Sequence, residues 1–274
     1  MESHKPEDPV VELLTTYNEL NSSRIEELDE EPSPLEFMRY VARNTPFVVR
    51  RSAQDWTATR TWNAAYLCST LAGHKVNVAV TPFGNADAPT PDGQGHTIFA
   101  KPHEEDQDFG QFLQYLSKRP KEGVKYDMRK RVEKSIAFAR IALERDPDAI
   151  NMWIGNSRSV TALHRDNYEN IYVQAAGRKH FVLLPPLFQP CVNEQDLEPA
   201  TYVRARSVGQ ARGEEEEGLV LRMDETVDDE ASKVPFATWD PDTPEVRATP
   251  YSHLAEPMRV SLEPGDMLYL PAMW

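Results

Sequence analysis

Cysteine is scarce in this sequence, and long apolar runs are absent. The 274 residues include two cysteines, Cys68 and Cys191, which are too few for a disulfide framework and lack CxxC spacing. No run of about 18 apolar residues occurs, so we expect no membrane-spanning helix and no membrane partner. The first nine residues, MESHKPEDP, are polar and lack the apolar core of a secretory signal. We therefore expect a cytoplasmic protein, with the nucleus as the alternative compartment.

Basic residues are also fewer than acidic residues. Lys and Arg number 30 against 44 Asp and Glu, which gives a net charge of -14. Non-specific binding of nucleic acid or anionic lipid needs a basic surface, so nucleic acid is not an expected partner. The charge suits a lysine- or arginine-rich protein segment, although solubility alone accounts for most of it. The length fits one large domain with extra elements or two small domains.

Residues 1–150 are predicted to form helices and a few strands that flank the main fold. Ser33 and Glu36 have the spacing of a capping box, and Pro34 suits the first helical position. Apolar periodicity and breaker residues predict helices over 9–20, 34–44, 64–71, 109–116 and 129–145, strands over 47–50 and 76–80, and a loop over 84–96.

From residue 151 onward the pattern changes to short strands, which favours a sandwich or barrel. We predict strands over 151–154, 169–175, 179–184, 200–203, 258–262 and 267–271. Ala176-Gly177-Arg178 would join the second and third of these as a hairpin. Residues 204–233 hold runs of Glu and Asp, which predict a flexible acidic insertion or, alternatively, a docking segment. The fold class is mainly β with flanking helices (α+β).

His164 and Asp166 carry the clearest chemical signal. In an extended segment, residues two apart point to the same side, so these two can converge while Arg165 points away. One imidazole with one carboxylate suits Fe(II), Mn(II) or Zn(II). A His-x-Asp triplet alone also occurs in ordinary surface turns. The residues around it are therefore needed to distinguish a metal site from such a turn.

Lys179 begins a strand whose same-face neighbours, Phe181 and Leu183, are apolar. A lysine on an apolar face is costly unless it meets an anion, and a cosubstrate carboxylate would fit. The alternative is a lysine at a strand end that reaches water. Further along, Pro264-Gly265 suits the centre of a type II turn before a buried strand, an arrangement also found in an ordinary hairpin.

Together these segments resemble the Jumonji-C, cupin-like family of Fe(II)- and 2-oxoglutarate-dependent oxygenases. The resemblance covers most of the chain and runs through residues 32–37, 44–46, 78–82, 84–88, 147–155, 160–186, 200–202 and 263–274. Matches in that number and order are hard to obtain by chance. The family fold is a double-stranded β-helix, or jelly roll, with the metal inside the barrel mouth. The resemblance implies this fold for residues 151–274.

The resemblance also implies roles for seven residues. His164 and Asp166 would be the first two iron ligands. Lys179 would pair with the distal carboxylate of 2-oxoglutarate, and Thr161 would form a hydrogen bond to it. Lining the same pocket would be Tyr126, Asn170 and Tyr172.

Two features depart from the family pattern. The family places its third ligand, a histidine, a few residues after the aromatic that matches Trp274, and this sequence has no residue there. A following strand with a further cosubstrate-contacting asparagine, and a helical region through which such proteins associate, are missing too. The other departure is Asp127-Met128-Arg129-Lys130-Arg131, where the family has a Gln- and Asn-rich segment. His180 and His253 are not placed to substitute for the third ligand.

We therefore expect a truncated product, a fragment or an incomplete gene model, with a barrel that is incomplete at its C-terminal end. Its strand at 267–270 should lack one neighbour and expose an apolar edge. The resemblance implies that the complete protein is a 2-oxoglutarate-dependent protein hydroxylase that modifies lysine in a GTP-binding protein, and a homodimer is compatible with it. A site with only His164 and Asp166, as in the sequence given, would bind metal weakly, hold the cosubstrate poorly and leave this chain inactive. Alternatives are a histone-directed demethylase or peptidase, and a non-catalytic cupin-like binding module.

Overall fold

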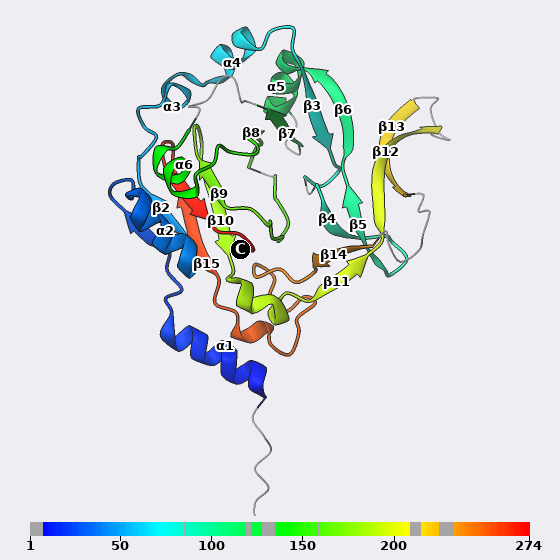
Figure 1. Cartoon of the computed structure of the whole chain (residues 1–274). Coiled ribbons are helices and arrows are strands. Elements are labelled where there is room, and N and C mark those ends of the chain that lie inside the picture. The colour runs from blue at the N-terminus through cyan, green and yellow to red at the C-terminus, as the bar shows by residue number, and fades with distance from the viewer. Residues whose placement is uncertain are drawn as a thin grey trace, which may run out of the picture.

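A computed structural model describes residues 8–84, 86–118, 122–127, 135–157, 159–208, 215–224 and 233–274, excluding the side chains of 114–118, 122–127, 206–208 and 215–217. In this part of the chain the strands form three four-stranded sheets and two two-stranded sheets. Figure 1 shows β2, β9, β10 and β15 on one side of the molecule and β3, β5, β6 and β12 on the other. The expected mainly β, cupin-like fold with flanking helices is confirmed.

The sheet that carries the candidate site has the order β1 (Glu26–Leu28), β2 (Phe47–Val49), β16 (Met267–Leu270) and β9 (Asn170–Val173). Helices α2 (Pro34–Arg43) and α6 (Ala137–Leu143) cover one face, and β10 (Lys179–Leu183) with β15 (Met258–Leu262) covers the other. Alternate residues therefore enter different layers: Tyr269 packs with Phe37 of α2, whereas Leu268 packs with Val260 of β15.

Two expectations about this region are wrong. Strand β16 does not have a bare edge, because it pairs with β2 on one side and with β9 on the other. Strands β9 and β10 do not form a hairpin, since β9 pairs with β16 and β10 pairs with β15. The turn at 176–178 instead carries the chain from one layer to the other. As a result Tyr172 and Phe181 meet ring to ring between layers, 5.0 Å apart.

A second sheet has the order β6 (His103–Asp108), β3 (Lys75–Val80), β7 (Glu122–Asp127) and β8 (Asn151–Ile154). Helices α4 (Ala64–Thr70) and α5 (Phe109–Lys118) flank it, with Phe109 and Phe112 packed against Val78. Helix α3 (Thr57–Thr61) precedes α4. The predicted helix over 129–145 is described only from residue 135 onward, and its helical part is α6.

The third sheet has the order β13 (Glu215–Met223), β12 (Pro199–Val208), β5 (Thr97–Lys101) and β4 (Ala88–Pro91). Two expectations fail here. Part of the acidic stretch is not a flexible insertion, because residues 200–208 pair in antiparallel register with 215–223; residues 209–214 and 225–232 lie outside the description. The predicted loop over 84–96 contains β4, whose prolines are tolerated at the sheet's edge.

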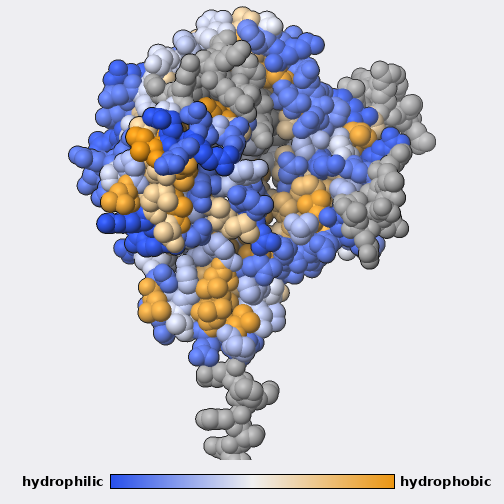
Figure 2. All heavy atoms as spheres, in the orientation of Figure 1, coloured by the Kyte–Doolittle hydropathy of each residue, from blue (hydrophilic) through white to orange (hydrophobic). Residues whose placement is uncertain are grey.

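The remaining elements close one end of the molecule. Helix α1 (Pro9–Leu20) packs Leu14 against Phe188 of η1 (Pro186–Cys191), close to η2 (Ser252–Leu254). Strands β11 (Glu194–Leu197) and β14 (Val234–Ala237) pair beside them. Figure 2 shows apolar side chains on the surface over α1, where Leu13 and Leu20 are exposed.

Local signals in the sequence are confirmed at two places. The side chain of Ser33 accepts a hydrogen bond from the Glu36 amide, and Glu36 caps the Ser33 amide in return. Gly265 has φ 92°, as the third residue of a type II turn requires, and the Asp266 amide donates to the Glu263 carbonyl. Among the described helices, none has the length and apolarity needed to cross a membrane.

Strands on the two sides of residue 150 share sheets: β8 pairs with β7, β12 with β5, and β16 with β2. The division of the chain into residues 1–150 and 151–274 stays a prediction.

Candidate metal centre and cosubstrate pocket

His164 and Asp166 lie together in the loop that precedes β9. Nε2 of His164 is 3.7 Å from Oδ2 of Asp166, and the two side chains are 42% and 56% exposed. Divalent metals bind such nitrogen and oxygen atoms at about 2.0–2.2 Å, so two bonds can span this separation. The two side chains therefore converge on one side of the segment, as their spacing predicts.

The hydrogen bond of the His164 imidazole favours a tautomer that leaves Nε2 free to bind a metal. Its Nδ1 lies 2.8 Å from the carbonyl oxygen of Ala162. A carbonyl oxygen only accepts hydrogen bonds, so Nδ1 is the protonated, donating nitrogen. In the neutral ring, Nε2 then carries the free lone pair, and Nε2 is the atom that faces Asp166.

Three contacts fix the loop that holds this pair. The guanidinium of Arg165 forms an ion pair with Glu194 at 2.9 Å, which turns Arg165 away from its two neighbours. The Tyr269 hydroxyl donates to Glu169 at 2.5 Å. The Met273 amide donates to the Asp166 carbonyl at 2.7 Å. Each contact comes from a different part of the chain, so the loop is positioned by β11, by β16 and by the segment after β16.

Lys179 lies in a half-buried, apolar setting at the start of β10. Its ammonium is 5.8 Å from the ring centre of Phe181, and burial lowers the pKa of Lys179. Within the described residues no carboxylate forms an ion pair with it. The Phe181 ring also contacts Tyr172 edge-on. Lys179 and Tyr172, from facing layers, are therefore linked through Phe181.

The other predicted site residues are placed less closely. Thr161 is exposed, three residues before His164. Asn170 and Tyr172 are two residues apart in β9 and so lie on the same face of the strand, where they pair with Leu270 and Leu268 of β16. The Tyr172 hydroxyl donates to Gln174 at 3.0 Å, and burial raises the pKa of this phenol. Tyr126 lies in β7 opposite Met152, and its side chain is outside the description.

A third metal ligand is not brought to this pair by any part of the chain that the structure describes. No group of three His, Cys, Asp or Glu side chains suited to one ion occurs there. His180 points away from Lys179, as expected, and its Nδ1 is 2.7 Å from the Ser261 hydroxyl. His253 lies in η2. A facial site of two histidines and one carboxylate would need one further histidine.

Comparison with known proteins decides the family. The model of the cupin-like domain matches residues 32–274. A human protein named bifunctional peptidase and (3S)-lysyl hydroxylase JMJD7 is 35% identical over 263 residues, which cover 90% of this chain and 77% of that protein. The chain belongs to the cupin-like Jumonji-C family.

Two further Jumonji-C relatives have similar coverage. The JmjC domain-containing protein E of Dictyostelium discoideum is 31% identical, over 89% of this chain and 75% of its own length. The lysine-specific demethylase JMJ32 of Arabidopsis thaliana is 30% identical, over 92% of this chain and 76% of its own length. The Jumonji-C family consists of oxygenases and hydroxylases that generally use Fe(II) and 2-oxoglutarate.

Sequence reasoning missed the contacts that support this candidate site. Asn44 contacts Ala272 and Trp274, and Glu169 contacts Tyr269. Asn44 before Thr45-Pro46 could have been predicted as the end of a helix, since asparagine tolerates the left-handed conformation there. Its partners lie more than 200 residues away in the chain, and no local pattern indicates them.

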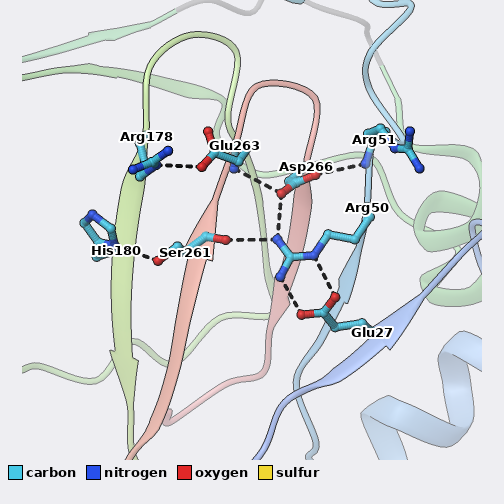
Figure 3. A network of polar contacts seen from close by, with 8 residues as sticks. All are labelled: Glu27, Arg50, Arg51, Arg178, His180, Ser261, Glu263 and Asp266. Carbon is cyan, nitrogen blue, oxygen red and sulfur yellow. Dashed lines mark hydrogen bonds and ion pairs between the residues drawn. The ribbon is translucent and has the colours of Figure 1, made fainter.

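A polar network holds the turn before β16 (Figure 3). Arg50 of the β2 end donates to Asp266 at 2.7 Å and to the Ser261 carbonyl at 2.9 Å, while its other nitrogens bind Glu27. The amides of Arg51 and Glu263 also donate to the Asp266 carboxylate. Burial alone would raise the pKa of Asp266, but these hydrogen bonds outweigh it and lower the pKa. The network fixes the register of β16, which leads to Met273.

Proposed function

We propose that this chain carries two of the metal ligands and the cosubstrate lysine of an Fe(II)- and 2-oxoglutarate-dependent protein hydroxylase that modifies a lysine side chain. The observation that carries the proposal is the His164–Asp166 pair, with Nε2 and Oδ2 3.7 Å apart and Nδ1 of His164 committed to the Ala162 carbonyl. That arrangement supplies two anchored ligands of the kinds that Fe(II) accepts. Family membership and the lysyl hydroxylase relative add support.

The residues present also suit the cosubstrate. Lys179 is half-buried and has no ion-pair partner in the described residues, so an anion would relieve the cost of its burial. 2-Oxoglutarate would supply one carboxylate for Lys179 and a keto-acid end for the metal. Thr161, Asn170, Tyr172 and Tyr126 are proposed to line the same pocket, each by resemblance to the family.

Within this proposal the roles divide clearly. When bound, iron with 2-oxoglutarate supplies the oxidation of a substrate C–H bond by dioxygen, with release of succinate and carbon dioxide. His164 and Asp166 hold the metal, and Lys179 sets the direction of the cosubstrate by a charge-assisted contact. Phe181, which lies beside Lys179, and Tyr172, which packs on Phe181, would shield that contact from water.

The proposed substrate is a lysine-bearing segment of a GTP-binding protein. The net charge of -14 favours a basic partner, and the family resemblance points to this substrate class. Homodimer formation stays a prediction. A second candidate activity, demethylation, is favoured by the 30% identical relative named as a lysine-specific demethylase, and the human relative's name includes peptidase.

Mass spectrometry of one set of lysine-containing peptides separates these reactions. The chain is incubated with Fe(II), 2-oxoglutarate and unmodified or methylated peptides, and succinate is measured in parallel. We expect succinate release and a gain of one oxygen on lysine. The matched control is the double variant His164→Ala and Asp166→Ala, which should release none.

Other results would identify other functions. Loss of a methyl group would identify a demethylase, and chain cleavage would identify a peptidase. A folded chain that binds peptide without releasing succinate would support a non-catalytic binding module and overturn the hydroxylase proposal.

A further inference from the structure

We propose that Asn44 is a positioning residue for the metal ligand Asp166, although it lies far from that ligand in sequence and touches neither metal ligand itself. This inference rests on the proposed function, because it assumes that His164 and Asp166 hold a metal. It adds a residue from the flanking helical layer to the machinery of the site.

Asn44 forms hydrogen bonds to the segment after β16 with both the amide nitrogen and the amide oxygen of its side chain. It occupies the C-cap of α2 with φ 49°, a left-handed conformation that asparagine tolerates better than most residues. Its Nδ2 donates to the Ala272 carbonyl at 3.0 Å. The Trp274 indole Nε1 donates to Oδ1 of Asn44 at 2.6 Å and to its backbone carbonyl at 2.8 Å. Trp274 is also buried, at 8% exposed, so its hydrogen bonds to Asn44 are shielded from water.

The segment after β16 in turn forms a hydrogen bond to the backbone of Asp166. Met273 lies between the two residues that Asn44 binds, and its amide donates to the Asp166 carbonyl at 2.7 Å. Met273 has φ 74°, a left-handed conformation that is costly for a residue with a side chain. Such a conformation persists only where the surroundings enforce it. The bonds of Asn44 to Ala272 and Trp274 supply that restraint on both sides.

Asp166 depends on such an anchor because little else fixes it. Its side chain is 56% exposed, and the loop from 161 to 169 contains no helix or strand. Arg165 and Glu169 are tied to Glu194 and Tyr269, but neither tie reaches Asp166 itself. If Asn44 is lost, Met273 can relax to negative φ and withdraw its amide. The Asp166 carboxylate then loses its fixed distance from His164.

The test compares Asn44→Gly with a matched control, Asn18→Ala. Glycine keeps the left-handed conformation at position 44 and removes only the side-chain contacts. Asn18 makes a similar long-range bond, from its Nδ2 to the Leu254 carbonyl at 2.9 Å, but lies on α1 away from the loop. The probe is Co(II), whose dissociation constant is measured by visible absorption for the wild type, both variants and His164→Ala.

A second readout needs no metal. Hydrogen exchange of the Met273 amide, followed by NMR in the metal-free chain, reports directly on its bond to Asp166. Asn44→Asp is the conservative variant, since it keeps the acceptor for Trp274 and loses the donor to Ala272. It also keeps the test available if Asn44→Gly does not fold.

We expect Asn44→Gly to weaken Co(II) binding about tenfold, the lower end of the range for residues that orient metal ligands. The Met273 amide should exchange faster, Asn44→Asp should fall between glycine and wild type, and Asn18→Ala should match the wild type. Equal Co(II) affinity and equal Met273 exchange in Asn44→Gly and Asn18→Ala would overturn the inference alone. Absence of His164-dependent Co(II) binding in the wild type would reject the proposed function and the inference with it.

Discussion

The hydroxyl of Tyr269 donates a hydrogen bond to Oε2 of Glu169 across 2.5 Å, which ties the middle strand of a sheet to the loop of the candidate metal centre. Tyr269 is fully buried, and burial together with Glu169 raises the pKa of its phenol. The phenol is therefore neutral and a donor at all ordinary pH values. The bond links core packing to the position of the site.

Replacing Tyr269 with phenylalanine removes this bond and leaves the ring. We expect the free energy of unfolding to fall by about 1.5–3 kcal/mol, the usual loss for a hydrogen bond to a charged group, measured by urea denaturation. Tyr66→Phe is the control, because Tyr66 is 38% exposed. Equal stability of the two variants would show that the bond contributes nothing to folding.

Asp266 should make stability depend on acid pH. Its pKa is lowered in the folded chain, so its contribution is complete above the unfolded value of 3.8 and is lost as pH falls through the lower folded value. Asp266→Asn should cost roughly 2 kcal/mol at pH 7 and progressively less below pH ~4. Urea titrations at several pH values test this against Asp55→Asn, an exposed partner of Arg60. A cost that stays constant with pH would contradict this assignment.

Without 2-oxoglutarate, Lys179 should lower the folding stability at neutral pH, in contrast to the stabilising contribution of Asp266. Burial lowers its pKa, so its charge costs stability below the folded pKa, and the cost fades as pH rises toward the ordinary value of 10.5. Lys179→Met should therefore stabilise the chain at pH 7 by up to about 1 kcal/mol, with a smaller gain near pH 10. Lys75→Met, at an exposed position, is the control for both measurements. Destabilisation by Lys179→Met at pH 7 would mean that Lys179 already has a partner.

The interior position of β16 predicts a large cost for shortening Leu268. This side chain is fully buried and packs between the sheet and β15. Leu268→Ala should lower the free energy of unfolding by about 2–5 kcal/mol through lost contacts and a cavity. Leu35→Ala, at a position 68% exposed, should change it by less than about 0.5 kcal/mol. A small effect at Leu268 would favour the bare-edge arrangement that the structure contradicts.

Local features of this fold could be predicted from sequence because short-range interactions determine them. The capping box at Ser33 and Glu36, the turn at Gly265, and the i and i+2 convergence of His164 and Asp166 each involve neighbours in the chain. Strand partners could not be predicted the same way. The turn at 176–178 has hairpin composition, yet the partners of β9 and β10 are strands some 80 to 100 residues away.

The support of the candidate site was likewise hidden from sequence. The residues next to Asn44 predict only that a helix ends there. Its contact with Trp274 arises from the tertiary fold. The edge predicted at β16 failed for the same reason, because β2, more than 200 residues earlier, covers it. Roles of Thr161 and Tyr126 still rest on resemblance.

Calorimetric titration of 2-oxoglutarate into the chain preloaded with Mn(II) tests the proposed site as a whole. We expect binding that requires Mn(II) and that is lost in both His164→Ala and Lys179→Met, because one residue holds the metal and the other holds the cosubstrate. Lys75→Met should bind like the wild type. No binding by the folded wild type, or undiminished binding by the two site variants, would contradict the assignment of these residues to metal and 2-oxoglutarate.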